Sequence, residues 1–211
     1  ARLLIKLVPD YFPPEKLCVF EETGTVGIQF SQLPFDHLVF TGSGATGKAV
    51  MASAAKNLTP VTLELGGKSP AVIAPDYPIS KAVERIMFAK IFNAGQVCVD
   101  VDYIFVPEGR IDEFVSACKA WTKKHCPDIN SGDYTSIIDQ RSYERLQAAL
   151  ADAERLGATL VNLTDGQESN PEQRKIPPHL VIDATDEMVL LQREIFGPIM
   201  PVLPYKDQHQ V

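Results

Sequence analysis

Two short motifs hold residues whose types and spacing suit a shared chemistry. The first, residues 64–68, places Glu64 before a Gly-Gly-Lys turn. The second, residues 93–98, presents Cys98 after an Asn-Ala-Gly-Gln turn. A thiolate can attack a carbonyl carbon and form a covalent intermediate, and a carboxylate can activate the water that later hydrolyses this intermediate. The two motifs together therefore indicate covalent thiol catalysis followed by base-assisted hydrolysis.

The elements that would position Glu64 alternate between strand and helix patterns. Apolar runs predict strands at residues 17–20, 37–41 and 61–65, and a helical pattern covers residues 44–57. This βαβαβ order predicts a parallel sheet with right-handed crossovers, whose ligands bind at the carboxyl ends of the strands. Glu64 lies at such an end. It closes an apolar strand, so we expect a buried carboxylate there, with an exposed strand end or an ion pair with Lys68 as the alternative.

The elements around Cys98 are short strands between longer amphipathic helices. Strands are expected at residues 70–74 and 101–106, and a helix is expected to start with Ser80 as its N-cap and to end toward Gly95. Cys98 would then lie just beyond a helix C-terminus, where thiolate formation depends on other neighbours. Three apolar stripes predict core-facing helices: Val83, Ile86, Met87 and Ile91; Ile111, Phe114, Val115 and Cys118; and Tyr143, Leu146, Leu150 and Ala153, the last closed by Gly157.

Residues 42–47 read Gly-Ser-Gly-Ala-Thr-Gly, a literal GxGxxG between a predicted strand and a predicted helix. One interpretation is the first turn of a Rossmann fold, in which Glu64 binds a ribose hydroxyl. However, a complete strand and helix precede the motif, and Glu64 is followed at once by the Gly-Gly-Lys turn and the thiol motif. We therefore favour the interpretation that leaves Glu64 free for catalysis. Lys48 is followed by Ala49 rather than the Ser or Thr of a P-loop, which argues against phosphate transfer.

A third motif, Glu194-Ile195-Phe196-Gly197-Pro198, completes a family pattern. Together the three motifs resemble the aldehyde dehydrogenase superfamily, and within it the class 3 and coniferyl aldehyde dehydrogenase branch. The resemblance implies an α/β fold: a partial Rossmann-type parallel sheet followed by an α/β catalytic domain. Residues 1–67 would be the C-terminal part of an NAD(P)-binding domain, and residues 68–211 an incomplete catalytic domain.

The resemblance also implies the roles of individual residues. Cys98 would attack an aldehyde, and its backbone N–H would help to hold the oxyanion; the family's Asn donor belongs to an upstream segment, so Asn93 is not assigned that role. Glu64 would activate the hydrolytic water, giving a carboxylic acid. Coniferyl aldehyde is the preferred substrate, with another aromatic or a fatty aldehyde as the alternative. NAD or NADP would be held by residues Gly42, Ser43, Gly47, Leu65, Glu194 and Phe196.

Composition restricts the partners and the setting. A net charge of −7 argues against nucleic acid and anionic membranes, and no apolar run reaches the length of a membrane span. The four cysteines show neither a CxxC pair nor metal-ligand spacing, so no metal site and a reduced, cytoplasmic setting are expected. Cys18, Cys118 and Cys126 are expected to be small buried hydrophobic residues.

The chain starts at Ala1 without an initiator Met, and we expect it to be a fragment. By itself it should have little activity, and the full-length protein should be a homo-oligomer. Two other functions stay open: an acyl-phosphate reductase, which shares the thioester step but releases an aldehyde, and a non-catalytic binding or assembly module. Glu64 argues against the first, because hydrolysis needs a base. The presence of Glu64, Cys98 and Glu194 together argues against the second.

Overall fold

The structure, a computed structural model, describes residues 1–207, 209 and 211. The chain forms two compact units, Ala1–Leu65 and Gly66–Val211. The assignment of residues 1–67 to nucleotide binding and of residues 68–211 to catalysis remains a prediction.

The first unit contains the predicted strand–helix–strand core. Its elements are α1 (Arg2–Tyr11), α2 (Val26–Phe30), β1 (Leu38–Gly42), α3 (Gly44–Ala55) and β2 (Val61–Leu65). β1 and β2 pair in parallel, with Leu38 opposite Val61 and Gly42 opposite Leu65. A parallel pair needs a crossover, and α3 supplies it. The register sets Thr41 beside Glu64 at the carboxyl ends of the two strands.

The predicted strand at residues 17–20 is wrong, because these residues form no strand. The backbone N–H of Leu17 instead donates to the carbonyl of Pro13, at 3.2 Å, in a turn after the Pro13-Pro14 pair. An apolar run becomes a strand only when a neighbouring strand completes its hydrogen bonds. Among the described residues β1 pairs only with β2, and the side chains of Leu17 and Phe20 are exposed.

The second unit is built on a five-stranded sheet of order β3-β4-β7-β6-β5. All neighbours are parallel except β5, which runs antiparallel to β6. The elements, in chain order, are β3 (Pro70–Val72), α4 (Ile79–Ile91), η1 (Phe92–Gly95), β4 (Tyr103–Pro107), η2 (Glu108–Arg110), α5 (Ile111–His125), α6 (Gln140–Arg155), β5 (Thr159–Asn162), β6 (His179–Ile182), α7 (Val189–Gln192) and β7 (Ile199–Tyr205). The mixed α/β architecture with parallel sheets agrees with the predicted fold class.

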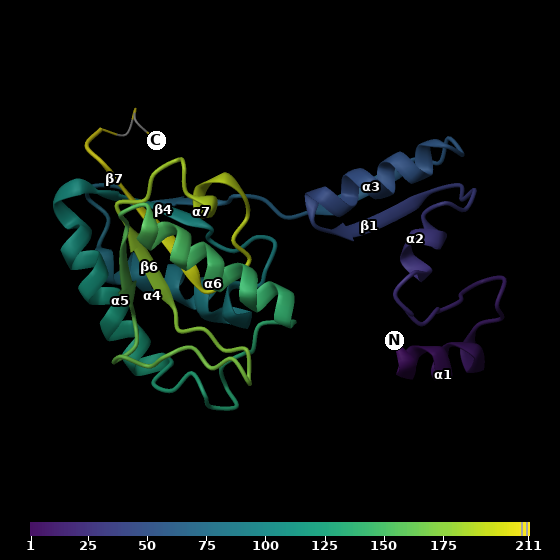
Figure 1. The fold of residues 1–211 in the computed structure, drawn as a ribbon, viewed down its shortest axis with the longest axis horizontal. Helices are drawn as coiled ribbons and strands as arrows, with labels where there is room; N and C mark the ends of the chain where they lie inside the picture. The colour runs from purple at the N-terminus through teal and green to yellow at the C-terminus, as the bar shows by residue number, and fades with distance from the viewer. Residues whose placement is uncertain (208, 210) are drawn as a thin grey trace. The chain divides into compact units, whose positions relative to one another are not determined.

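Helices cover both faces of this sheet (Figure 1). Side chains of α4 and α5 pack with one set of strand residues, which includes Leu180, and side chains of α6 pack with another set, which includes Val181. Successive strand residues point to opposite faces, so Leu180 and Val181 belong to different layers. The three predicted apolar stripes are confirmed as core-facing, since their members are buried or partly buried in these clusters.

Two local predictions need correction. Helix α4 begins at Ile79 with Pro78 as its N-cap, so Ser80 lies inside the first turn; proline, whose fixed φ suits the start of a helix, precedes it. Cys18 is exposed, whereas Cys118 and Cys126 are buried as predicted. Burial raises the pKa of the Cys126 thiol to about 11 and that of Cys118 further, so neither is a ready nucleophile.

Within the described residues, no helix combines the length and apolar character of a membrane span.

Candidate active site

The turn that carries Cys98 follows α4 through the short helix η1. Three consecutive residues, Asn93, Ala94 and Gly95, have φ values of 51°, 51° and 72°. Left-handed backbone is costly for residues with a Cβ, so the segment must be held by its surroundings. At Gly95 a side chain is also excluded by space, because a Cβ there would overlap the carbonyl of Gly197. The thiol turn and the Glu194–Pro198 motif therefore meet at these two glycines.

The buried side chain of Gln96 fixes the turn from one side. Its amide nitrogen donates to the carbonyls of Asn93, at 3.0 Å, and Ser136, at 3.1 Å. Its amide oxygen accepts from the backbone N–H of Ile138 at 2.9 Å. Each amide atom thus has a partner, as a buried polar group requires. Gln96 ties the residues before Cys98 to a segment that is distant in sequence.

Cys98 itself lies in the next turn, where the backbone N–H of Asp100 donates to the carbonyl of Val97 at 3.1 Å. Its thiol is free and exposed. The predicted position just beyond the C-terminus of a helix is confirmed, since α4 ends at Ile91 and η1, which continues it, ends at Gly95. An exposed thiol on a turn held by its surroundings is available to an incoming electrophile.

Glu194 is partly buried against the glycine turn of the first motif. A Cβ at Gly66 would overlap its carboxylate, so only glycine permits this approach. Burial raises the pKa of Glu194, and the nearby charge of Asp102 acts in the same direction, while a hydrogen bond from the Gly67 backbone opposes both. Its Oε1 atom is buried and has no hydrogen-bond partner among the described residues.

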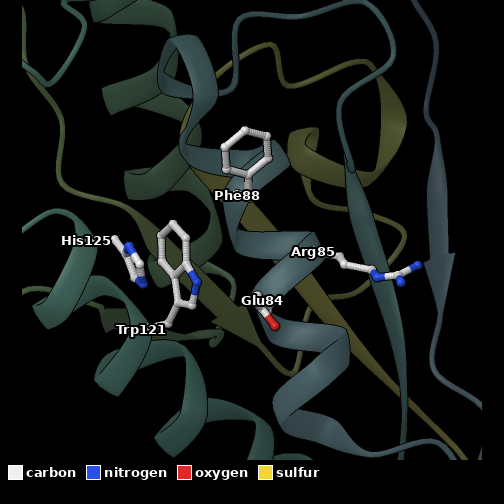
Figure 2. Close-up of a pocket in the computed structure, with 5 residues that line it drawn as sticks. All are labelled: Glu84, Arg85, Phe88, Trp121 and His125. Atoms are coloured by element: carbon white, nitrogen blue, oxygen red, sulfur yellow. The ribbon is translucent and has the colours of Figure 1, made fainter.

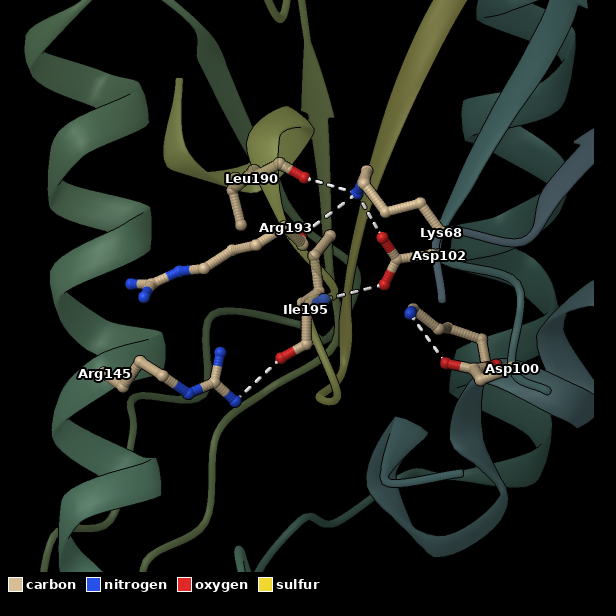
Figure 3. A network of polar contacts seen from close by, with 8 residues as sticks. Lys68, Asp100, Asp102, Arg145, Leu190, Arg193 and Ile195 are labelled. Atoms are coloured by element: carbon tan, nitrogen blue, oxygen red, sulfur yellow. Dashed lines mark hydrogen bonds and ion pairs between the residues drawn. The ribbon is translucent and has the colours of Figure 1, made fainter. Parts of the chain in front are cut away.

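An ion-pair network holds the loop that carries Glu194 (Figure 3). The ammonium of Lys68 pairs with the buried carboxylate of Asp102 and donates to the carbonyls of Leu190, at 2.7 Å, and Arg193, at 3.3 Å. The other oxygen of Asp102 accepts from the backbone N–H of Ile195 at 2.8 Å. These contacts fix the backbone on both sides of Glu194.

Arg145 of α6 completes the support from the opposite side. Its guanidinium donates to the carbonyl of Ile195 at 2.8 Å (Figure 3). Burial lowers the pKa of Arg145, and the neighbouring charge of Arg193 adds to this effect. Both backbone polar groups of Ile195 are thus engaged by charged side chains, which are stronger partners than neutral ones.

The contact between Gly66 and Glu194 leads to a testable prediction. Gly66→Ala would force the Glu194 carboxylate, the flexible end of its side chain, to shift, so we expect the free energy of unfolding to fall by about 1 kcal/mol, the low end of the losses at overpacked sites. Gly67→Ala is the matched control, because nothing lies within 4 Å of a Cβ at that residue. Denaturant titration of both variants would measure the difference. Equal, small losses in the two variants would contradict the contact.

The remaining predicted site residues lie in the first unit. Ser43 is the N-cap of α3, and its hydroxyl accepts from the backbone N–H of Thr46 at 3.3 Å. Gly47 is buried, and a Cβ there would lie 2.9 Å from the Leu65 side chain, so the lack of a side chain allows close packing of helix on strand. Glu64 is exposed rather than buried as predicted. Solvent therefore reaches the Glu64 carboxylate, which was expected in an apolar environment.

The structure brings together some of the predicted residues. Gly47 and Leu65 are in contact, and Glu194 meets the glycine turn that follows Glu64. Phe196 is 37% exposed and has a φ of 51° on the loop beside Gly197. The supporting residues Gln96, Asp102 and Arg145 were not predicted. Asp102 falls within the strand predicted at residues 101–106, and Arg145 carries no motif signal.

A separate hollow lies between α4 and α5 (Figure 2). It has a volume of about 480 Å³ and is lined by Glu84, Arg85, Phe88, Trp121 and His125. Trp121 and His125 stack with their ring centroids 4.4 Å apart. None of the five is a predicted site residue.

Comparison with known proteins gives one family. The model of the aldehyde dehydrogenase family matches residues 1–211. A probable coniferyl aldehyde dehydrogenase of Pseudomonas aeruginosa is 48% identical over 208 residues, which cover 98% of this chain and 43% of that protein. A coniferyl aldehyde dehydrogenase of Pseudomonas sp. (strain HR199) is 40% identical, and the matched residues cover 98% of this chain and 44% of that protein. The chain thus spans less than half the length of these relatives.

Solved structures give the same result. The substrate-bound state of Staphylococcus aureus AldH superposes with a TM-score of 0.88 and 36% identity, covering 99% of this chain and 45% of that one. An aldehyde dehydrogenase of Mycobacterium tuberculosis complexed with NAD⁺ has a TM-score of 0.77 and 32% identity. The match covers 87% of this chain and 39% of that one.

Proposed function

The chain belongs to the aldehyde dehydrogenase family, and on that premise we propose that its full-length protein oxidises an aldehyde to a carboxylic acid with NAD or NADP. The observation that carries the proposal is the exposed Cys98 thiol on a turn anchored by Gln96. Covalent catalysis needs an accessible nucleophile held in a fixed position, and this turn offers both.

In the proposed reaction the Cys98 thiolate attacks the aldehyde carbon. A carbon–sulfur bond forms, and the negative charge moves to the former carbonyl oxygen, where the backbone N–H of Cys98 can stabilise it. Loss of hydride from the same carbon converts the thiohemiacetal into a thioester. Glu64 then takes a proton from the attacking water, the carbon–sulfur bond breaks, and the acid leaves as Cys98 regains its thiolate.

The side chains present suit a nicotinamide dinucleotide, which supplies the hydride acceptor when it is bound. Glu194 has a buried carboxylate oxygen without a partner among the described residues, and a ribose hydroxyl would satisfy it. Phe196, next along the same loop, offers an exposed ring. In the first unit we propose Gly42, Ser43, Gly47 and Leu65 as the residues that hold the rest of the cofactor, at the carboxyl ends of β1 and β2 and the start of α3.

We propose coniferyl aldehyde as the substrate. Two relatives with that name in their description are 48% and 40% identical to nearly the whole chain. The exposed apolar residue Val99 follows Cys98 directly, and exposed Phe92 lies six residues before it; both suit an aromatic aldehyde.

The assay that tests this proposal uses the full-length protein with NAD or NADP. We expect reduced cofactor and ferulic acid to form in equal amounts from coniferyl aldehyde, with a higher kcat/KM than for an aliphatic aldehyde of similar size. If an acyl phosphate is instead reduced to an aldehyde, the protein is an acyl-phosphate reductase. If neither reaction occurs, it is a binding or assembly module.

A further inference from the structure

A second ion pair, Lys90 with Asp100, lies beside the thiol turn and is almost fully buried. The ammonium of Lys90 lies 2.8 Å from Asp100 Oδ2, and the two side chains are only 2% and 6% exposed. Figure 3 shows Asp100 next to the Lys68–Asp102 network. Lys90 belongs to the last turn of α4, and Asp100 follows Cys98 by two residues.

Stability alone does not explain this pair. Burial lowers the pKa of Lys90 and raises that of Asp100, so burial opposes both charges, and mutual attraction only partly compensates. Asp100 Oδ1 is also buried without a hydrogen-bond partner among the described residues. Apolar side chains of similar volume often stabilise such a position at least as well as an ion pair does. A pair that burial disfavours invites a functional explanation.

The position of Asp100 supplies that explanation. Its backbone N–H closes the turn over Val97 to Asp100, which carries Cys98. Its Oδ2 atom lies 3.1 Å from the point that a Cβ of Gly95 would occupy, so the carboxylate packs against the start of the same segment. Asp100 therefore places its carboxylate against residue 95 and closes the turn with its backbone N–H, while Lys90 ties the carboxylate to α4. Gln96 anchors the segment through separate contacts, to residues 136–138.

We propose that Lys90 and Asp100 are positioning residues that clamp the segment 95–100 onto α4 and thereby set the place of the Cys98 sulfur for attack. The inference rests on the proposed role of Cys98 as nucleophile. Neither residue is assigned a part in bond making or proton transfer. The clamp acts as a unit, because each charge needs the other to stay in place.

Hydrogen exchange in the full-length protein tests whether the Lys90–Asp100 pair holds residues 95–100 in place. The variants are Lys90→Met and Asp100→Asn, both close in shape to the original residues, and the double variant. We expect amides in a peptide covering residues 92–101 to exchange about tenfold faster in each, with a peptide inside α6 unchanged. Faster exchange in both peptides would mean general destabilisation, and unchanged exchange would mean no clamp; either overturns the proposal.

Single-turnover kinetics test whether the pair sets the place of the Cys98 sulfur for attack. With enzyme and NAD or NADP in excess over aldehyde, the plateau rate at saturating enzyme does not depend on the fraction of molecules that are folded. We expect this rate to fall by roughly ten- to a hundredfold in each single variant, as for a small misplacement of a reacting group. The double variant should lose no more than the more impaired single variant. Plateau rates within twofold of the unmodified protein, or effects that multiply in the double variant, would contradict the clamp.

Controls separate this inference from the proposed function. Glu113→Gln removes the charge from an exposed ion pair with Arg110 on the same unit and should change neither readout. Asp100→Asn, the nearly isosteric change, suffices for the test if Lys90→Met does not fold. If Cys98→Ala is inactive while the clamp variants behave as the unmodified protein, only the clamp is wrong. If Cys98→Ala stays active, the proposed function is wrong.

Discussion

Replacing Cys98 with alanine should abolish aldehyde oxidation by the full-length protein while leaving cofactor affinity nearly intact. Removing the nucleophile of a covalent mechanism lowers kcat by at least on the order of 10⁴-fold, because the other catalytic groups lose the atom on which they act. The alanine side chain keeps the turn, since its anchors are Gln96 and backbone atoms rather than the thiol. Steady-state turnover and fluorescence titration of the reduced cofactor measure the two effects.

Cys18→Ala is the matched control for this experiment. Cys18 is the other exposed thiol, and it lies in the first unit. We expect its replacement to leave turnover within about twofold, the size of effect typical of a surface change. Loss of activity in Cys18→Ala with retention in Cys98→Ala would reverse the assignment of the nucleophile.

Replacing Glu64 with glutamine should stop the reaction after the first turnover. The amide keeps the shape of the side chain but cannot take a proton from water, so hydrolysis of the thioester should slow by about 10²- to 10⁴-fold. A rapid burst of reduced cofactor, equal to the number of sites, would then survive while steady turnover collapses. Stopped-flow absorbance measures both phases in one trace.

The same experiment separates the two interpretations of the GxGxxG segment. If Glu64 instead binds a ribose hydroxyl, Glu64→Gln should mainly weaken cofactor affinity and leave turnover intact at saturating cofactor. Glu172→Gln, at an exposed loop residue, is the control for a change of one carboxylate to an amide. A weakened affinity with preserved turnover would return Glu64 to the dinucleotide-binding role.

Local periodicity predicted much of the fold. The order β1-α3-β2 and the apolar faces of α4, α5 and α6 follow from patterns of about two and 3.6 residues, which any short segment displays in its own sequence. The strand predicted at residues 17–20 shows where this reasoning ends. Its apolar run meets the local criterion, but strand formation also needs a pairing partner, which a local pattern does not reveal.

The site was predictable to the extent that its residues belong to motifs. Cys98, Glu64 and Glu194 stand in recognisable contexts, and Cys98 has the exposure expected of a nucleophile. The supports were not predictable, because they join segments far apart in the chain. Lys68 meets a carbonyl 122 residues away at Leu190, and Asp102 meets an N–H 93 residues away at Ile195. Only the folded sheet brings these partners together.

The exposure of Glu64 has a different origin. An apolar run over residues 61–65 predicted a strand, and burial of Glu64 near its carboxyl end was inferred from that. However, the carboxyl ends of the strands lie at one end of the sheet, where neighbouring layers no longer cover the side chains. In the structure the side chains of both Glu64 and Leu65 are exposed at this end. Strand membership therefore did not determine burial.

Trapping the covalent intermediate tests the mechanism most directly. The Glu64→Gln variant is mixed with coniferyl aldehyde and NAD or NADP, quenched in acid during the burst, and digested with trypsin. Cys18, Cys98, Cys118 and Cys126 fall in separate tryptic peptides, and the peptide of residues 91–110 contains only Cys98. We expect the mass of a feruloyl group on that peptide and its absence when cofactor is omitted. A feruloyl group on another cysteine, or a full burst with no acylated peptide, would contradict catalysis by Cys98.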